Sequence, residues 1–151
     1  MELLALLAAG IFLYVQQAKK FLDNIRFKFI DIKLDWSKTL ASALSKVFLV
    51  FKFDIINTTD FEGKLLVLHL DIFYKGNQIA TVDSKEPLVF GKKATTRASF
   101  PVTISTLNTV KKFKEVFNDM KAGRDIAVTI KGYADVTAGR VNINETKMLN
   151  V

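Results

Sequence analysis

Apolar and polar side chains alternate along most of this 151-residue chain from Phe27 to the C-terminus, and this two-residue period constrains the fold more than any other feature. Successive side chains of a β-strand point to opposite faces, so the alternation predicts strands with one buried and one exposed face. The alternation changes parity between Phe29 and Ile30, which predicts a bulge in the first strand. Turn-forming residues separate the segments, and short strands at this spacing predict an all-β sandwich of about seven strands. The expected strands cover residues 27–36, 47–56, 65–74, 79–83, 95–104, 126–136 and 141–151, with a short edge segment at 88–90.

The residue types in some of these segments also predict where each segment lies in the sheet. Residues 47–56 are apolar on both faces, as expected for a central strand. Pro101 cannot donate a ladder hydrogen bond, so the strand that contains it is predicted to lie at an edge. Residues 75–78 are predicted to form a tight hairpin with Gly76 at the first central position. The buried face of the preceding strand is expected to hold Leu66, Leu68, Leu70, Ile72 and Tyr74.

One α-helix is predicted between the strands at 95–104 and 126–136. Ser105 or Thr106 can cap its start, and Gly123 can close it in the left-handed conformation. Its apolar positions recur at spacings of three and four, as in an amphipathic helix. They are Leu107, Val110, Phe113, Phe117 and Met120.

The N-terminal residues 1–15 carry a single charge, Glu2, and are otherwise almost entirely apolar. The apolar run is shorter than the roughly 20 residues that span a bilayer, but a helix extended to Leu22 would be about 30 Å long. We therefore expect a single-pass membrane anchor at 1–26, followed by one domain at 27–151. A cleaved or lipoprotein-type signal and an interfacial or protein-buried helix are the alternatives. Because basic residues follow the apolar run and none precedes it, the domain is expected on the cytoplasmic side. The anchor would consist of Leu3, Leu4, Leu6, Leu7, Ile11, Phe12, Leu13 and Val15.

The chain has a net charge of +7, which suggests an anionic neighbour such as acidic lipid or nucleic acid. A lysine-rich solvated surface would give the same charge. No aromatic and basic module of a known nucleic-acid reader is present. The candidate anion-facing residues are Lys19, Lys20, Lys111, Lys112 and Lys114.

The sequence offers little of the chemistry that enzymes use. It has no cysteine, which excludes disulfides, thiolate nucleophiles and zinc-thiolate sites. His69 is the single histidine, and Asp71 lies two residues further on, but no nucleophile elbow accompanies them. We expect His69 to be a partly exposed strand residue, and we predict no catalytic, cofactor-binding or metal-binding residues.

The order of elements resembles a known family. Residues 48–82 show a hydrophobic strand that ends in Asn, a loop with an aromatic residue, a strand, a hairpin and a small residue. Phe100-Pro101-Val102, the helix, a strand interrupted at Gly132 and a C-terminal strand follow in the same order. This arrangement resembles the water-stress and hypersensitive-response domain of group 2 late-embryogenesis-abundant proteins, although Thr58 stands where the family usually has proline. The residues that carry the likeness are Asn57, Phe61, Tyr74, Gly76 and Ala80.

The resemblance implies a seven-stranded immunoglobulin-like sandwich with one helix, no enzymatic activity and an N-terminal helix that tethers the domain to a membrane. We therefore expect a membrane-anchored protein with a stress-protective or binding role. A structural subunit of a large assembly, such as a membrane-associated virion or envelope complex, is the alternative, and a small hydrolase or metal enzyme is the least favoured. The expected partners are membrane lipid, other proteins and, with weaker support, nucleic acid, with no small-molecule substrate.

Overall fold

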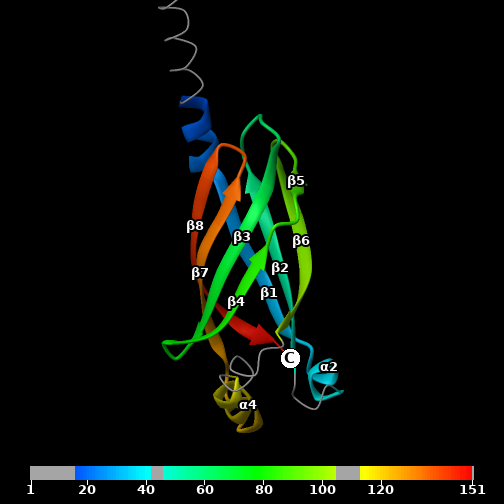
Figure 1. The fold of residues 1–151 in the computed structure, drawn as a ribbon. Coiled ribbons are helices and arrows are strands. Elements are labelled where there is room, and N and C mark those ends of the chain that lie inside the picture. Colours follow the sequence, from blue (N-terminus) through cyan, green and yellow to red (C-terminus); the bar gives the residue numbers. More distant parts are fainter. Residues whose placement is uncertain (1–15, 42–45, 105–112, 151) are drawn as a thin grey trace, which may run out of the picture.

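The computed structural model describes residues 16–41, 46–104 and 113–150, and β-strands make up most of them (Figure 1). A helical segment at residues 16–23 precedes the first strand. The elements that follow are β1 (Ile25–Leu34), α2 (Trp36–Ala41), β2 (Val47–Asn57), β3 (Gly63–Tyr74), β4 (Asn77–Ser84), β5 (Leu88–Phe90), β6 (Ala94–Ile104), α4 (Lys114–Lys121), β7 (Ala127–Val136) and β8 (Gly139–Asn150).

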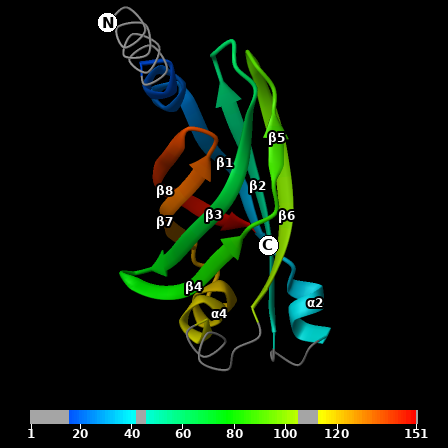
Figure 2. The same cartoon turned by 45° about the horizontal axis from the view of Figure 1, so that its top comes forward.

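The described strands form two facing layers that are joined into one sheet. Their hydrogen-bonded order is β4-β3-β7-β8-β1-β2-β6, with β5 also paired to β3. The sheet curls round into a nearly closed barrel (Figure 2). All-β structure is thus confirmed, but the two layers are not the separate sheets expected of an immunoglobulin-like sandwich. The reason is β8, which leaves β7 after Met148 and continues as a parallel neighbour of β1 at Leu149 and Asn150.

The predicted bulge in the first strand is confirmed. The register of β1 against β2 shifts between Phe29 and Asp31, so an extra residue moves the buried face to the other parity. Phe29 is therefore buried before the bulge and Ile32 after it. The backbone N–H of Phe29 donates to Glu145 Oε2 on β8 at 3.2 Å.

A second bulge, in β3, makes the buried face of this strand differ from the predicted one. The register against β7 shifts between Leu65 and Val67, so Leu65 points into the core and Leu66 is 42% exposed. The prediction that Leu66 lies on the buried face is wrong, because uninterrupted alternation does not hold across this bulge. Leu68, Leu70, Ile72 and Tyr74 are buried as predicted.

The hairpin after β3 lies one residue earlier than expected. Tyr74 pairs with Asn77, so Lys75 and Gly76 are the two central residues. Both have positive φ, 49° and 79°, as in a type I′ turn. Gly76 is thus the second central residue, and Lys75 takes the left-handed conformation at the first position.

The end of the predicted helix is confirmed at α4. Gly123 has a φ of 73°. Its N–H donates to the Met120 carbonyl at 3.0 Å, and the Arg124 N–H donates to the Asp119 carbonyl at 3.0 Å. This is the hydrogen-bond pattern of a Schellman motif. The predicted start of the helix, at residues 105–112, lies outside the described residues.

Two further strand predictions hold. Residues 47–57 form β2, which lies between β1 and β6 and is therefore central. Pro101 lies in β6, which is an edge strand of the described sheet. The expected edge segment at 88–90 is a genuine strand, β5, so the described sheet has eight strands instead of about seven.

The predicted single-pass localisation is contradicted. Across residues 16–41, 46–104 and 113–150, none of the helices has the length and apolar character needed to cross a bilayer. The helical segment at 16–23 carries charged side chains and buries Phe21 against Phe90, with ring centroids 6.0 Å apart. The predicted anchor residues Leu3, Leu4, Leu6, Leu7, Ile11, Phe12, Leu13 and Val15 lie outside the described residues.

Candidate functional site

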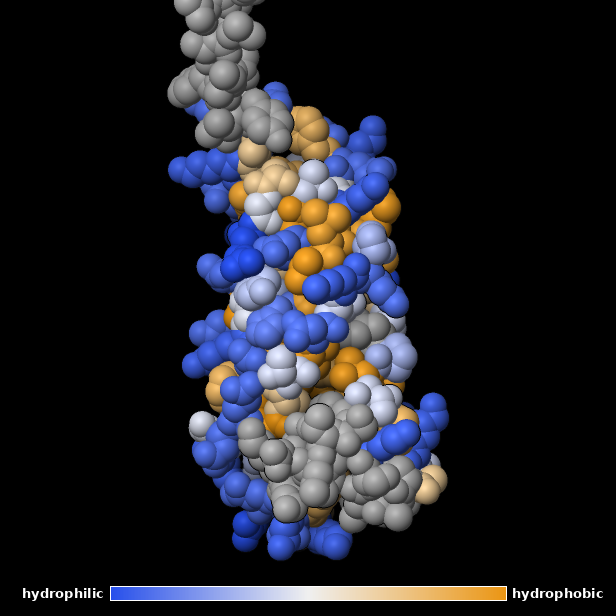
Figure 3. Space-filling view, viewed as in Figure 1, coloured by the Kyte–Doolittle hydropathy of each residue, from blue (hydrophilic) through white to orange (hydrophobic). Residues whose placement is uncertain are grey.

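The curled sheet stays open between its two edges, and a cavity of about 330 Å³ lies there. One side is formed by β6, and the other by the end of β4 and its link to β5. Figure 3 shows apolar side chains, in orange, at the surface between β3 and β6. We call this hollow the seam cavity. It is lined by Phe53, Leu65, Leu68, Ser84, Glu86, Pro87, Leu88, Arg97, Ala98 and Ser99.

The floor of the seam cavity consists of core side chains. Phe53 is 1% exposed, and Leu65 and Leu68 are buried as well. The ring of Phe53 packs 5.7 Å from that of Phe29, which holds it in place. Ala98 lies opposite Phe53 in the register of β6 and β2 and is partly buried. The cavity therefore has an apolar floor carried by strands and a partly polar rim, a combination common in ligand-binding sites.

Both strands that flank the seam cavity are edge strands of the described sheet. β6 pairs with β2 and β4 pairs with β3; neither is hydrogen-bonded to a second described strand, although part of β6 lies close to β5. In an antiparallel ladder, alternate residues direct their backbone N–H and C=O toward the same neighbour. Each edge therefore presents unpaired donors and acceptors along its free side. The seam cavity combines these groups with an apolar floor.

An ion pair lies beside the seam cavity. Arg97 on β6 faces Asp54 on β2 and donates hydrogen bonds of 2.9 Å from Nε and 3.2 Å from Nη2. The hydrogen bond from Arg97 lowers the pKa of the Asp54 carboxyl below its ordinary value, although burial acts in the opposite direction. The Arg97 side chain is 63% exposed, so its guanidinium is held in place and still open to solvent.

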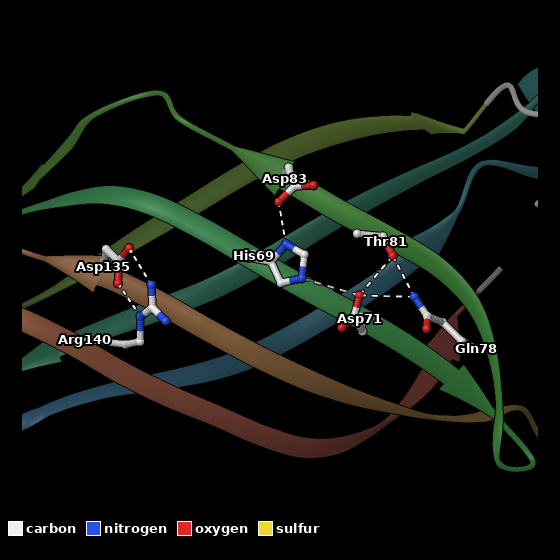
Figure 4. Close-up of polar contacts among 7 residues, drawn as sticks. All are labelled: His69, Asp71, Gln78, Thr81, Asp83, Asp135 and Arg140. Carbon is white, nitrogen blue, oxygen red and sulfur yellow. Dashed lines mark hydrogen bonds and ion pairs between the residues drawn. The ribbon is translucent and has the colours of Figure 1, made fainter.

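A second polar cluster lies on the opposite, outer face of β3 and β4 (Figure 4). His69 Nδ1 lies 2.5 Å from Asp83 Oδ1, and His69 Nε2 lies 3.5 Å from Asp71 Oδ1. The hydrogen bond to Asp83 raises the pKa of His69 above its ordinary value. Both ring nitrogens thus face carboxylates, which favour the protonated ring. His69 is partly exposed, as predicted.

The same cluster continues across the sheet as a stack. The rings of His69 and Tyr133 are 5.2 Å apart, and the Arg140 guanidinium lies 3.6 Å from the Tyr133 ring centroid. Arg140 also donates to both carboxylate oxygens of Asp135, at 2.7 and 3.2 Å. These contacts link β3, β7 and β8. In the described parts of the chain, no three histidine or carboxylate side chains are placed to share a metal ion.

A buried carboxylate joins the hairpin after β3 to α4. Asp119 accepts a hydrogen bond of 2.5 Å from the Tyr74 hydroxyl and pairs with Lys75 and Arg124, each at 3.0 Å. The hydrogen bond from Tyr74 lowers the pKa of Asp119 below its ordinary value, although burial raises it. The Asp119 carboxylate thus has all three of its donors within the chain, which indicates that it has a structural role.

The asparagine singled out by the family resemblance also has a structural role. Asn57 is buried and donates from Nδ2 to the carbonyls of Phe61 and Gly91, at 2.7 and 2.9 Å. Its Oδ1 accepts from the N–H and hydroxyl of Thr59, at 3.0 and 2.6 Å. Asn57 thus fixes the loop between β2 and β3 and ties it to the segment after β5.

Comparison with known protein families shows to which family the chain belongs. Residues 52–147, more than half of the chain, match the LEA_2 model, described as late embryogenesis abundant protein. The chain belongs to this late embryogenesis abundant family. The family is generally non-enzymatic and is associated with a stress-related role. A search of curated proteins gave no match.

Comparison of this late embryogenesis abundant domain with solved structures gave matches at low sequence identity. A protein from Archaeoglobus fulgidus is 13% identical, with a TM-score of 0.49 over 82% of this chain and 90% of that one. The Northeast Structural Genomics Consortium target SoR45 is 12% identical, with a TM-score of 0.49 over 85% of this chain and 87% of that one. Similarity at this level says nothing about function.

The predicted anion-facing lysines do not form one group in the late embryogenesis abundant domain. Lys19 and Lys20 are exposed on the helical segment at one end of the barrel, and Lys114 is exposed on α4 at the other end (Figure 1). Lys111 and Lys112 lie outside the described residues. Whether any of them binds an anion stays a prediction.

Sequence reasoning missed the seam cavity. Pro101 and the short segment at 88–90 both indicated sheet edges, but no local signal shows that those edges face each other. Two other cavities lie elsewhere among the described residues. One, of about 490 Å³, adjoins the end of α4 at Met120 and Arg124, and the other, of about 220 Å³, adjoins Phe21 and Phe61. Neither is flanked by two strand edges.

Proposed function

We propose that this late embryogenesis abundant protein is non-enzymatic, acts by binding, and uses the seam cavity as its binding site. The observation that carries the proposal is the position of Phe53, Leu65 and Leu68, which form an apolar floor that opens between two unpaired strand edges. A ligand with an apolar part would cover this floor and remove it from water, which is the main source of favourable binding energy.

The polar clusters support a non-catalytic role. Both nitrogens of His69 are engaged by carboxylates, and the Asp119 carboxylate is engaged by three donors. These groups hold strands and α4 together, and none of them lines the seam cavity. The family association with stress agrees with a protective binding role. Membership of the water-stress and hypersensitive-response subfamily stays a prediction, and nothing among the described residues supports a virion or envelope subunit.

A pocket-filling variant tests the site. Ala98→Met places a larger apolar side chain in the seam cavity, whereas Ala94→Met makes the same change on β6 at an exposed position outside it. The neutral fluorescent probe N-phenylnaphthylamine should bind the unmodified chain. Its affinity should fall roughly tenfold in Ala98→Met, because the volume it needs is occupied.

The Ala94→Met control should bind the probe as the unmodified chain does. Circular dichroism of both variants checks that each has the native strand content. Equal probe affinity in the two folded variants would show that the seam cavity is not the binding site.

A further inference from the structure

We propose that the natural ligand of the seam cavity is an extended polypeptide segment that alternates apolar and acidic residues and adds to β6 as a further strand. This inference rests on the proposed function, because it names the ligand of the same cavity. It differs from an acyl chain or another small apolar molecule, which would fill the floor without using the strand edge.

The free edge of β6 is the first reason to favour a polypeptide. Between Ala94 and Ile104, alternate residues direct unpaired backbone C=O and N–H groups to its outer side, although Pro101 has no N–H to contribute. Only another extended backbone can satisfy such a row in register, which is the recognition mode called β-augmentation. A small apolar ligand would leave these groups to water.

The side-chain pattern is the second reason. A strand added beside β6 directs every second side chain toward the barrel interior. Those side chains would meet the floor at Phe53, Leu65 and Leu68, so they should be apolar. The intervening side chains would point outward, beside the outward-facing side chains of β6.

The charge of the outer face is the third reason. Arg97 uses Nε and Nη2 to bind Asp54, and its Nη1 makes no hydrogen bond to a described residue. Lys52 is exposed and lies in register between Ser99 on β6 and Asp31 on β1. An acidic side chain on the added strand would lie beside Arg97 and contribute a favourable cross-strand pair. Glu86 lines the other side of the seam cavity and would repel the acidic side chains of the added strand. These side chains should therefore lie on the β6 side.

The test uses the full chain and blocked synthetic peptides of about nine residues, which span roughly 30 Å when extended. The probe peptide alternates valine and glutamate. It should bind and displace N-phenylnaphthylamine from the seam cavity. A valine and lysine peptide of the same length should bind at least about tenfold more weakly, because lysine would lie beside Arg97.

Two further peptides test the strand edge itself. One carries N-methyl groups on every valine amide and the other on every glutamate amide, so each loses the hydrogen-bond donors of one edge. At least one of them should bind about tenfold more weakly than the parent peptide. If both bind as tightly as the parent, the peptide does not pair with β6 and the inference is wrong.

Protein variants separate the charge effect from general electrostatics. Arg97→Gln should reduce the preference for the glutamate peptide over the lysine peptide. Lys33→Gln removes one charge from an exposed position on β1, two strands away, and should leave that preference unchanged. If both variants lost this peptide preference equally, net charge and not Arg97 would determine it. That result would contradict the inference.

The outcomes distinguish the two proposals. Binding of the neutral probe that Ala98→Met weakens, with no binding of any peptide, would overturn the polypeptide ligand and keep the seam cavity as an apolar site. Failure of both the probe and the peptides to bind would overturn the proposed function itself.

Discussion

The Tyr74 hydroxyl donates a 2.5 Å hydrogen bond to Asp119, a residue 45 positions later in the chain, and this contact joins the last residue of β3 to α4. Tyr74 is 4% exposed and Asp119 is 6% exposed, so the bond is shielded from water. The helix is therefore held against the end of the barrel by a specific polar contact as well as by apolar packing.

Removing this hydroxyl should destabilise the fold. Tyr74→Phe keeps the ring but leaves Asp119 with one donor fewer, and hydrogen bonds to charged groups contribute about 2 kcal/mol. We expect the free energy of unfolding, measured by urea denaturation, to fall by about that amount. Tyr133→Phe removes a hydroxyl on β7 that forms no hydrogen bond with a described residue and should change the stability little. Equal effects of the two substitutions would contradict a special role for the Tyr74 contact.

Gly132 should tolerate no side chain. A Cβ at this position would lie 1.9 Å from the backbone carbonyl oxygen of His69, so β3 and β7 would have to separate. Gly132→Ala should therefore lower the free energy of unfolding by about 3 kcal/mol. Gly91→Ala is the matched control, because its new Cβ would meet Ala94 at 3.5 Å, an ordinary contact. A thermal melt of Gly132→Ala that matches the control would show that the two strands are not so close.

The stability should depend on pH through His69. Its pKa is raised in the folded state, chiefly by the hydrogen bond to Asp83, so the contribution is complete below the unfolded pKa of 6.5. It is lost as the pH rises through the higher folded pKa. Urea denaturation at pH 5.5 and 8.5 should show less difference in His69→Gln than in the unmodified chain. An unchanged difference would assign the pH dependence to other groups.

A substitution in the last hairpin should stabilise the protein. Ala138 has a φ of 82°, a conformation in which the Cβ of a non-glycine residue is strained. Ala138→Gly removes this strain and should raise the free energy of unfolding by about 0.5 to 1 kcal/mol, after the entropy cost of glycine. Gly76→Ala is the converse change, at a φ of 79°, and should lower it. A loss of stability in Ala138→Gly would contradict the assigned turn geometry.

Features with a local cause were predictable from the sequence. The parity change after Phe29 shows the bulge directly, because alternation depends only on neighbouring residues. Gly123 marks the end of α4 because the left-handed conformation favours glycine. Pro101 indicates an edge because its missing N–H is a property of the residue itself.

Features with a distant cause were not predictable in the same way. Leu66 is exposed because β3 shifts its register against β7, and no residue near Leu66 signals that shift. Asp119 is paired by residues from the β3–β4 hairpin that lie far from it in sequence. The seam cavity depends on how far the whole sheet curls before its edges meet.

The alternation of apolar residues alone determined that the described chain is β-rich, where several strands begin and end, and which side chains are buried wherever no unsignalled bulge intervenes. The tertiary structure decided that β8 joins the two layers and that β4 and β6 face each other across an apolar floor. The physical reason is that strand periodicity is set by the backbone of each segment. Pairing, curvature and the cavity between the edges are set by contacts among segments far apart in the chain.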